Sequence, residues 1–291
     1  MFLSLLLSVP SQTCVPRGSF TPIYFDFATV VRSNLGGIPG RCVDAGECEE
    51  LQSASTPNEI FLRNVGYYPD PDTPGATPLS LRITNETEYR AWNPRLNGIN
   101  RRGGSPTASF GIVNLLGPRA VGTARSWDPT LTFVQLRYEF LDATTGSALT
   151  LPRTYITFYD FDTHGTTDRG VESLQYGPQG IRAELPAATS LSQVAPPVEL
   201  SAALTAAGVA GQAGWSSVVY TATTTGTGAD NPTNTYTLSS SAAMKAVMIV
   251  VEASSHLQVR FLIHGCCTTG RNFMFAGYSD IVSPLCPYPP A

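Results

Sequence analysis

The stretch HLQVRFLIHG, His256 to Gly265, indicates the fold class more clearly than any other part of the chain. Gln258 and Arg260 are polar, and the positions around them are apolar: Leu257, Val259, Phe261 and Ile263. Apolar side chains at every second residue are typical of a β-strand that buries one face. The sequence therefore predicts a strand here, with Gln258 and Arg260 on its opposite face.

Further segments of the same character follow one another along the chain, each rich in β-branched and aromatic residues and bounded by turn-forming residues. They span residues 21–31, 58–68, 78–92, 109–116, 130–142, 153–162, 215–224, 244–254 and 272–282. No segment keeps a helical period of 3.6 residues, and the Ala-rich section 197–212 predicts a loop with one short helix. Short strands at this spacing predict an all-β fold, an antiparallel β-sandwich of the jelly-roll kind.

The predicted strands extend toward both ends of the chain, which favours one sandwich domain over residues 12–291. The Ala- and Pro-rich section 184–212 is the one credible internal boundary, and we interpret it as a long loop. The segment ATTGSALTLP contains Gly146 and predicts a hairpin connection between the strands at 130–142 and 153–162.

The chain carries little charge. Charged residues make up 14% of it, below the roughly 25% usual in soluble domains. A net charge of −4 argues against binding to nucleic acid, and the densest basic spot, Arg101-Arg102, is too small for a phosphate-binding stripe. Of the 18 basic residues, Lys245 is the only lysine, and we interpret this preference for arginine as the coding bias of a GC-rich genome.

The amino terminus combines an apolar block, Phe2 to Leu7, with Val9 and Ser11 at positions that suit a signal-peptidase site. Residues 1–11 are therefore predicted to be a signal peptide, with a truncated gene model or a buried first strand as the alternatives. No other segment approaches the roughly 18 apolar residues that cross a bilayer. The sequence thus predicts a secreted protein without a transmembrane segment.

Six cysteines lie near the two ends of the chain: Cys14, Cys42, Cys48, Cys266, Cys267 and Cys286. An even number without a CxxC pair predicts up to three disulfides in an oxidising compartment. Cys42 and Cys48 flank a short acidic loop and are expected to pair, and bridges from the Cys14 region to the 266–286 region would join the terminal segments. Zinc binding and free thiols are the alternatives, although the chain has few histidines for a zinc site.

The stretch YITFYDFDTHG places two carboxylates at the end of an apolar run. On a strand, Asp160 and Asp162 point to the same face, where two neighbouring charges need a cation, a shared proton or water. Asp26 in the similar stretch YFDFAT, Asp280 after a later strand and Asp230 in the loop GTGADNPTN are further candidate ligands. Calcium prefers such oxygen ligands, so a structural calcium site is one hypothesis. The alternative is that these carboxylates only organise the turns that follow a strand.

Two other functions would use the same residues. A calcium-dependent carbohydrate-binding, lectin-like module would hold a sugar beside Asp160, Asp162 and Asp230. A glycoside hydrolase would need a pair of carboxylates across a cleft, for which Asp160, Asp162 and Glu139 are candidates. The sequence contains no GxSxG, HExxH or P-loop motif. We therefore expect a protein that is not an enzyme and that needs no cofactor beyond the hypothetical calcium.

Four blocks, YFDFATVVRSNLGG, YITFYDFDTHG, GTGADNPTN and GRNFMFAGYSD, follow in this order between residues 24 and 280. With them the chain resembles an extracellular β-rich module of surface and secreted proteins of protists such as dinoflagellates, diatoms and other algae. The likeness covers nearly the whole chain. The resemblance implies secretion and a role at the cell surface or in an extracellular matrix, and it transfers no catalytic residue.

These features together predict a secreted structural or interaction protein of the cell surface or of an extracellular assembly. Its expected partners are other extracellular proteins, further copies of the chain, or glycans. Self-association is expected because a long apolar strand such as AVMIVV needs either a closed sheet or a partner to cover its edges, and a weakly charged surface leaves little repulsion between copies. Asn85 begins an N-glycosylation sequon, which suits a secreted protein. A viral capsid jelly roll shares the architecture, but the leader and the cysteines argue against it.

Overall fold

The computed structural model describes residues 14, 19–43, 47–50, 52–53, 55–69, 74–101, 109–118, 131–163, 170–226, 230–265 and 269–281. The strands of this part are β1 Thr29–Ser33, β2 Glu59–Tyr68, β3 Thr77–Asn85, β4 Gly98–Arg101, β5 Ser109–Leu116, β6 Leu131–Asp142, β7 Leu151–Tyr159, β8 Val171–Tyr176, β9 Gly180–Glu184, β10 Leu191–Val194, β11 Val219–Ala222, β12 Val247–Ser254, β13 His256–His264 and β14 Gly270–Ala276. Its helices are α1 Val198–Ala206 and α2 Ser240–Ala243, with short 3-10 turns η1 Leu35–Gly37, η2 Arg41–Val43 and η3 Pro94–Leu96.

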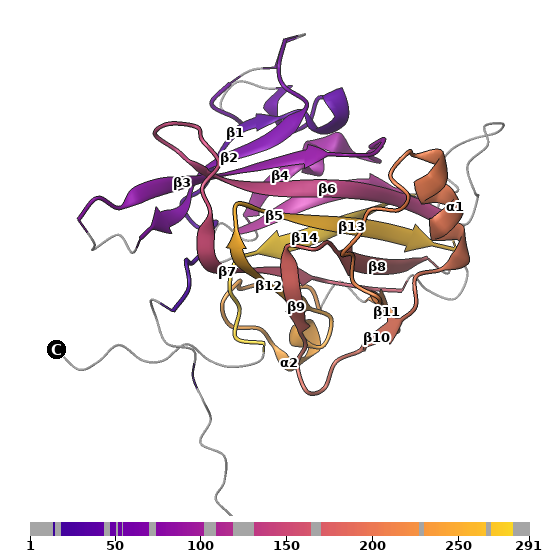
Figure 1. The fold of residues 1–291 in the computed structure, drawn as a ribbon. Helices are drawn as coiled ribbons and strands as arrows, with labels where there is room; N and C mark the ends of the chain where they lie inside the picture. The colour runs from indigo at the N-terminus through magenta and orange to yellow at the C-terminus, as the bar shows by residue number, and fades with distance from the viewer. Residues whose placement is uncertain are drawn as a thin grey trace, which may run out of the picture.

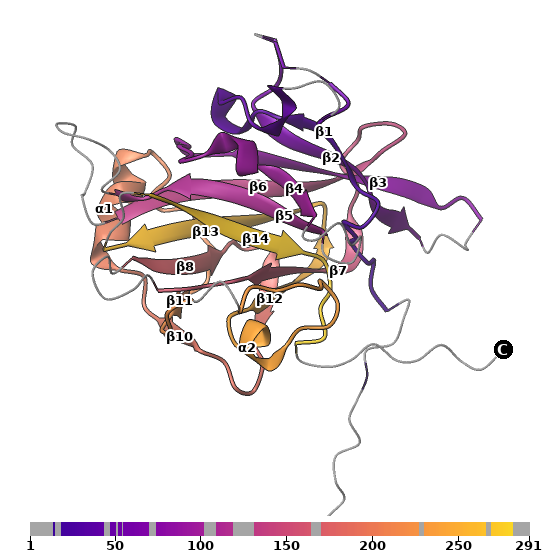
Figure 2. The same ribbon diagram turned by 180° about the vertical axis from the view of Figure 1, so that it is seen from behind.

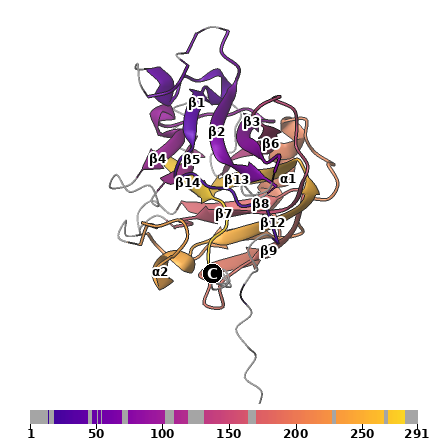
Figure 3. The same ribbon diagram turned by 90° about the vertical axis from the view of Figure 1, so that its left-hand side faces the viewer.

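The strands form two antiparallel sheets (Figure 1). The first sheet has the order β1-β2-β3-β6-β13-β8-β11-β10, and the second has the order β4-β5-β14-β7-β12-β9. Figures 1 and 2 view the molecule from opposite sides, and the side view of Figure 3 shows the sheets lying face to face. The predicted all-β antiparallel sandwich is confirmed.

The alternating stretch of the sequence is β13, which lies between β6 and β8 in the middle of the first sheet. Its alternating apolar side chains are buried in the core of the sandwich. Phe261 stacks on Phe273 of β14 with ring centroids 4.2 Å apart, and it meets Phe158 of β7 edge-on at 5.6 Å. Burying one such side chain stabilises the fold by about 1.5–3 kcal/mol. The alternation in one strand thus builds the contact between the two sheets.

The outer face of the first sheet is covered over part of its area. Arg260 lies on this face, as predicted, yet it is only 3% exposed. Its guanidinium lies 3.5 Å from the ring of Trp215 and donates hydrogen bonds to Gln135 (2.9 Å) and Gln175 (3.1 Å). Burial lowers the pKa of Arg260 to about 10. Helix α1 covers a neighbouring area, where Leu200 packs in a second, smaller apolar cluster.

Several predicted elements differ from the observed ones in their bounds. The predicted strand 21–31 is regular only from Thr29, although Phe25 in the irregular part is fully buried. The backbone there still bonds to strands of both sheets, from Thr21 N to Arg153 O and from Tyr24 N to Val65 O, each 2.7 Å. Strands β4, β8, β9 and β10 lie outside the predicted segments, and α1 is the short helix expected within 197–212.

One expectation about strand neighbours is wrong, and a second is resolved in favour of one of its alternatives. Strands β6 and β7 do not form a hairpin, because β6 pairs with β3 and β13 while β7 pairs with β12 and β14. The chain between them crosses from one sheet to the other. Strand β12, which contains most of AVMIVV, pairs with β7 on one side and β9 on the other. Its edges therefore need no external partner, so self-association loses this premise and stays a prediction.

Cys42 and Cys48 form the predicted disulfide, with their Cα atoms 5.0 Å apart. Cys14 is disulfide-bonded as well, and among the described residues no cysteine is free. The other three cysteines, Cys266, Cys267 and Cys286, lie outside the described residues, as does the predicted signal peptide.

Candidate functional site

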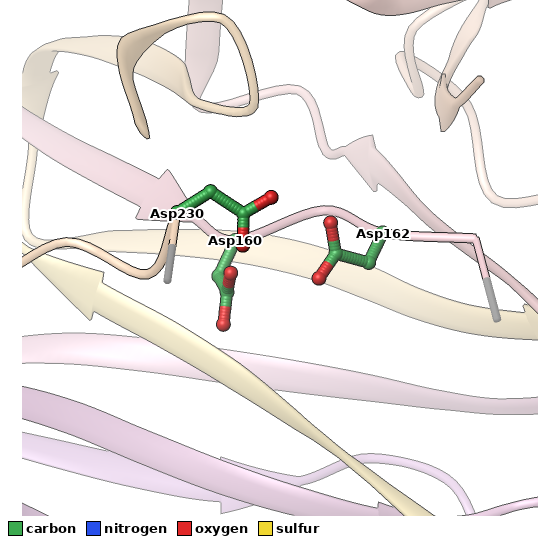
Figure 4. A group of neighbouring side chains, drawn as sticks. All are labelled: Asp160, Asp162 and Asp230. Atoms are coloured by element: carbon green, nitrogen blue, oxygen red, sulfur yellow. The ribbon is translucent and has the colours of Figure 1, made fainter. Parts of the chain in front are cut away.

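The acidic residues singled out by the sequence meet at the end of β7. The strand ends at Tyr159, and Asp160 adopts a left-handed backbone conformation with φ of 65° that stops the regular alternation. Asp160, Asp162 and Asp230 each place a carboxylate oxygen within 4.8 Å of the others. Figure 4 shows the carboxylates of Asp162 and Asp230 directed toward one another, with that of Asp160 pointing downward in the view. The structure thus unites residues that are far apart in the sequence.

Lys245 supplies the positive charge of this cluster. It lies between α2 and β12 and is only 5% exposed. Its Nζ donates to Asp162 Oδ1 at 2.5 Å, to Asp230 Oδ2, and to the carbonyl oxygen of Thr225 at 3.2 Å. An ammonium group has three N–H donors, so each of them has an acceptor here.

Burial and pairing act in opposite directions on these groups. Burial raises the pKa of the Asp162 carboxyl, and the ammonium of Lys245 opposes this shift. Burial by itself lowers the pKa of Lys245, but the hydrogen bonds to Asp162 and Asp230 outweigh it, so the pKa of the amine is raised. The lysine and its two carboxyl partners therefore depend on one another for their charge states.

A pocket of about 280 Å³ lies beside the cluster. Polar groups and two glycines line it: Asp160, Asp162, Thr163, Glu172, Gly226, Asn231, Gly270, Arg271 and Asn272. Glu172 of β8 is buried, accepts a hydrogen bond from the Asp162 backbone N–H at 3.1 Å, and lies 3.5 Å from Arg271 Nε. Burial raises the pKa of this carboxyl well above its usual value, and the nearby charge of Arg271 acts against that rise.

The donor set only partly fits a calcium ion. Three carboxylates lie close enough to share a cation. Two of them, however, already accept hydrogen bonds from Lys245, whose single positive charge supplies part of what a calcium ion would bring. The calcium hypothesis stays a prediction, with Lys245 as a built-in competitor.

The other two predicted calcium ligands lie outside this cluster and hold loops in place. Asp26 Oδ2 accepts a hydrogen bond from the hydroxyl of Tyr236 at 2.7 Å, and burial raises the pKa of Asp26. Asp280 Oδ1 accepts from the backbone N–H of Leu238 at 3.4 Å. Both carboxylates therefore bind the segment that leads into α2.

Glu139, the third candidate for a hydrolase pair, is engaged elsewhere. It lies on β6 and accepts from Arg82 Nε at 3.0 Å and from Arg137 at 3.2 Å. Burial raises its pKa, but these two arginines outweigh that influence and lower it. Glu139 does not line the pocket beside Asp160 and Asp162, so the structure does not bring the proposed pair together.

Asn85, the predicted glycosylation site, ends β3. Its side-chain amide donates to the carbonyl oxygen of Thr87 at 2.8 Å, and Thr87 is itself buried and accepts from the Gln135 backbone N–H at 2.9 Å. Glycosylation at Asn85 stays a prediction.

Sequence reasoning missed Lys245, Glu172 and Arg271 as members of the site. A signal for Lys245 is present, because it is the one lysine of the chain and stands within the apolar run AAMKAVMIVV. A charge inside such a run needs a partner on folding. Nothing in the local sequence around Glu172 or Arg271 points to the pocket.

Comparisons with known proteins give little guidance. No protein family and no curated protein matches the chain. Among solved structures, the chain is similar to the N-terminal domain of the Streptococcus gordonii adhesin Sgo0707, at 11% sequence identity and a TM-score of 0.39. The match covers 75% of this chain and 47% of that one, so this chain spans about half of its length. Within the described residues, no helix has the length and apolar character that a membrane crossing requires.

Proposed function

We propose that the protein is an extracellular structural or interaction module that catalyses no reaction of a substrate. The observation that carries this proposal is the Cys42–Cys48 disulfide, together with the oxidised state of Cys14. Disulfides form and persist in oxidising compartments and are rare in the cytosol. The low charge and the sandwich architecture are in keeping with this location.

The acidic residues support a role without catalysis. Asp162 and Asp230 bind the ammonium of Lys245, Asp26 binds Tyr236, and Asp280 binds a backbone N–H. Side chains engaged in this way hold loops against the strands. This arrangement favours the turn-organising role over a general acid and base pair.

One part of the surface favours contact with partners. A pocket of about 110 Å³ is lined mostly by aromatic and proline residues: Ser19, Phe20, Thr21, Pro22, Tyr67, Tyr68, Pro69 and Pro152. Tyr67 is 45% exposed at this pocket. Phe27 lies outside the pocket, in the irregular segment before β1, and is 79% exposed. Exposed aromatic side chains are enriched where proteins bind one another.

The location is tested on material from the source cells. A maleimide reagent is applied to the native protein before and after reduction, and an antibody to the protein is applied to intact and permeabilised cells. We expect no thiol labelling until the protein is reduced, and staining of intact cells. Reactive thiols in the native protein, or staining that needs permeabilisation, would contradict an extracellular function.

A further inference from the structure

The amine of Lys245 lies close enough to two carboxyl groups to react with one of them as well as to form ion pairs. The side chains of Lys245, Asp162 and Asp230 are only 7%, 17% and 12% exposed. The amine nitrogen lies 2.5 Å from a carboxyl oxygen of Asp162, which places it within reach of the carboxyl carbon. The second carboxyl group, that of Asp230, contacts the same nitrogen from another side.

We propose that Lys245 and Asp162 condense to an amide bond, an intramolecular cross-link between the end of β7 and the start of β12. An ammonium proton passes to the carboxylate of Asp230, which already accepts a hydrogen bond from Nζ. The neutral amine attacks Cγ of Asp162, so a C–N bond forms. One Asp162 oxygen then leaves as water with the proton held by Asp230 and a second proton from nitrogen. The products are the amide, one water molecule and the regenerated Asp230 carboxylate, with no change in oxidation state.

The fold holds the two reacting residues side by side. The backbone N–H of Phe161, next to Asp162, donates to the carbonyl oxygen of Lys245 at 3.2 Å. The Asp162 N–H is bound by Glu172, and Gly226 packs so closely on the Asp162 carboxyl that a Cβ there would overlap it. Groups held in this way react with effective concentrations of about 10⁵–10⁸ M.

Asp162 is the better acceptor of the two carboxyl groups for a geometric reason. Its chain neighbour bonds directly to Lys245, and Glu172 and Gly226 fix its own backbone and carboxyl. Asp230 contributes a hydrogen-bonded oxygen, which suits a group that receives and returns a proton. The link would join residues 83 positions apart in the sequence.

The single lysine of the chain makes the test direct. A protease that cleaves only after lysine is added to the full-length, reduced and denatured protein, with a lysine-containing protein in the same tube to show that the enzyme is active. A free Lys245 gives two fragments. The amide removes this cleavage site, so we expect the wild-type chain to stay intact, and splitting of the wild-type chain would overturn the proposal.

Tryptic peptides identify the bond. Asp162 lies in the peptide 154–169, and Lys245 lies in the peptide 183–260 together with Asp230. We expect these two peptides to appear joined, with a mass equal to their sum less one water, and fragmentation to place the link at Asp162. A link within the peptide 183–260 would point to Asp230 and overturn the choice of acceptor.

Two variants complete the experiment. Asp162→Ala removes the acceptor, and its denatured chain should be cut at Lys245. Asp230→Asn removes the proton acceptor but leaves the side-chain size, and a large part of its chain should be cut. An Asp162→Ala chain that stays uncut would contradict the assignment. The wild-type digest does not depend on either variant folding.

Discussion

At the scale of single residues, the buried side chain of Lys245 governs the acidic cluster. Asp162 and Asp230 are carboxyl groups with little access to water, and Lys245 is the partner of both, through its ion pairs or through the proposed amide. Leaving such charges buried without a partner is far more costly than losing an exposed ion pair. Lys245 therefore contributes strongly to the stability of the sandwich at the end of β7.

Lys245→Met should lower the free energy of unfolding by about 3–5 kcal/mol, because it leaves two buried carboxylates without their partner. Urea unfolding followed by tryptophan fluorescence measures the change. The matched control is Arg182→Met, which breaks an exposed pair with Glu184 and should cost at most about 1 kcal/mol. Equal effects in the two variants would show that the Lys245 contacts contribute little.

The same substitution tests the calcium hypothesis. In the wild-type protein the Lys245 nitrogen engages two of the three carboxyl groups, whether as an ammonium or in the proposed amide, so added calcium should change the melting temperature little. In Lys245→Met the three oxygens within 4.8 Å lose their cation, and calcium should then raise the melting temperature. Thermal unfolding with calcium and with a chelator measures both. If calcium raised the melting temperature of both proteins by a similar amount, calcium would bind even with Lys245 in place, and the lysine would not be a competitor.

The two described histidines, His256 and His264, lie at the two ends of β13. We expect them to make the stability of the fold depend on pH. Burial lowers the pKa of His256 and of His264 below 6.5. As the pH falls through 6.5, the unfolded chain takes up protons at these residues before the folded chain does, so stability is lost.

We expect the urea midpoint to fall between about pH 7 and about pH 5.5, and to fall less in His264→Gln. The variant is compared with the wild type at each pH, so that carboxyl groups common to both cancel. The same decline in both proteins would exclude His264 as a source of the effect.

At the scale of elements, the segment between β10 and β11 serves as a cover for the first sheet. Trp215 lies over Arg260, whose guanidinium also bonds to Gln135 and Gln175 of the neighbouring strands. A cation over a desolvated aromatic ring contributes about 2 kcal/mol. Without the ring, the guanidinium would regain water and the loop would lose its anchor.

Trp215→Ala should therefore destabilise the fold by about 2 kcal/mol. Trp92→Ala is the control, since Trp92 is 52% exposed and its loss should change the free energy of unfolding by only about 0.5 kcal/mol. Urea titrations of the two variants give the comparison. If both variants unfold at the wild-type midpoint, the ring over Arg260 is not an anchor.

A strand could be predicted from the sequence where the alternation of apolar and polar residues alone determines its conformation. Strand β13 follows from its period of two, because one face packs in the core and the other faces outward. Residues 21–28 carry the same apolar signal, yet they run as an irregular segment whose backbone bonds to both sheets. Strand β8 was missed because its sequence, VESLQY, has no alternation, and the buried Glu172 and Gln175 find partners only in the folded molecule.

At the scale of the whole molecule, strand neighbours depend on contacts that no local pattern records. The short connection after β6 looks like a hairpin, but it crosses between the sheets so that β7 can pair with β12 and β14. The candidate site has the same origin. Asp160, Asp162 and Asp230 could be proposed from the sequence as candidate ligands, whereas Lys245 and Glu172 join them only through the topology.

The covalent framework gives a prediction at this scale. Replacing Cys42 and Cys48 together by serine removes a bridge across a short loop, and should lower the free energy of unfolding by about 2 kcal/mol. The double variant should keep its β-rich circular-dichroism spectrum, because Cys42 is one residue of a large core cluster and the strands of both sheets pair without the bridge. Unfolding in urea measures the loss, and complete unfolding of the variant without denaturant would assign the bridge a larger role.

The buried position of the one lysine also sets how the molecule meets its chemical environment. Apart from the chain terminus, the folded protein offers no primary amine to solvent. Aldehyde fixatives, glycating sugars, amine-directed dyes and ubiquitin-like conjugation all act on exposed lysines, and so would leave this surface unmodified. Outside a cell, where long-lived proteins meet reactive carbonyl compounds, such a surface would accumulate lysine modifications slowly.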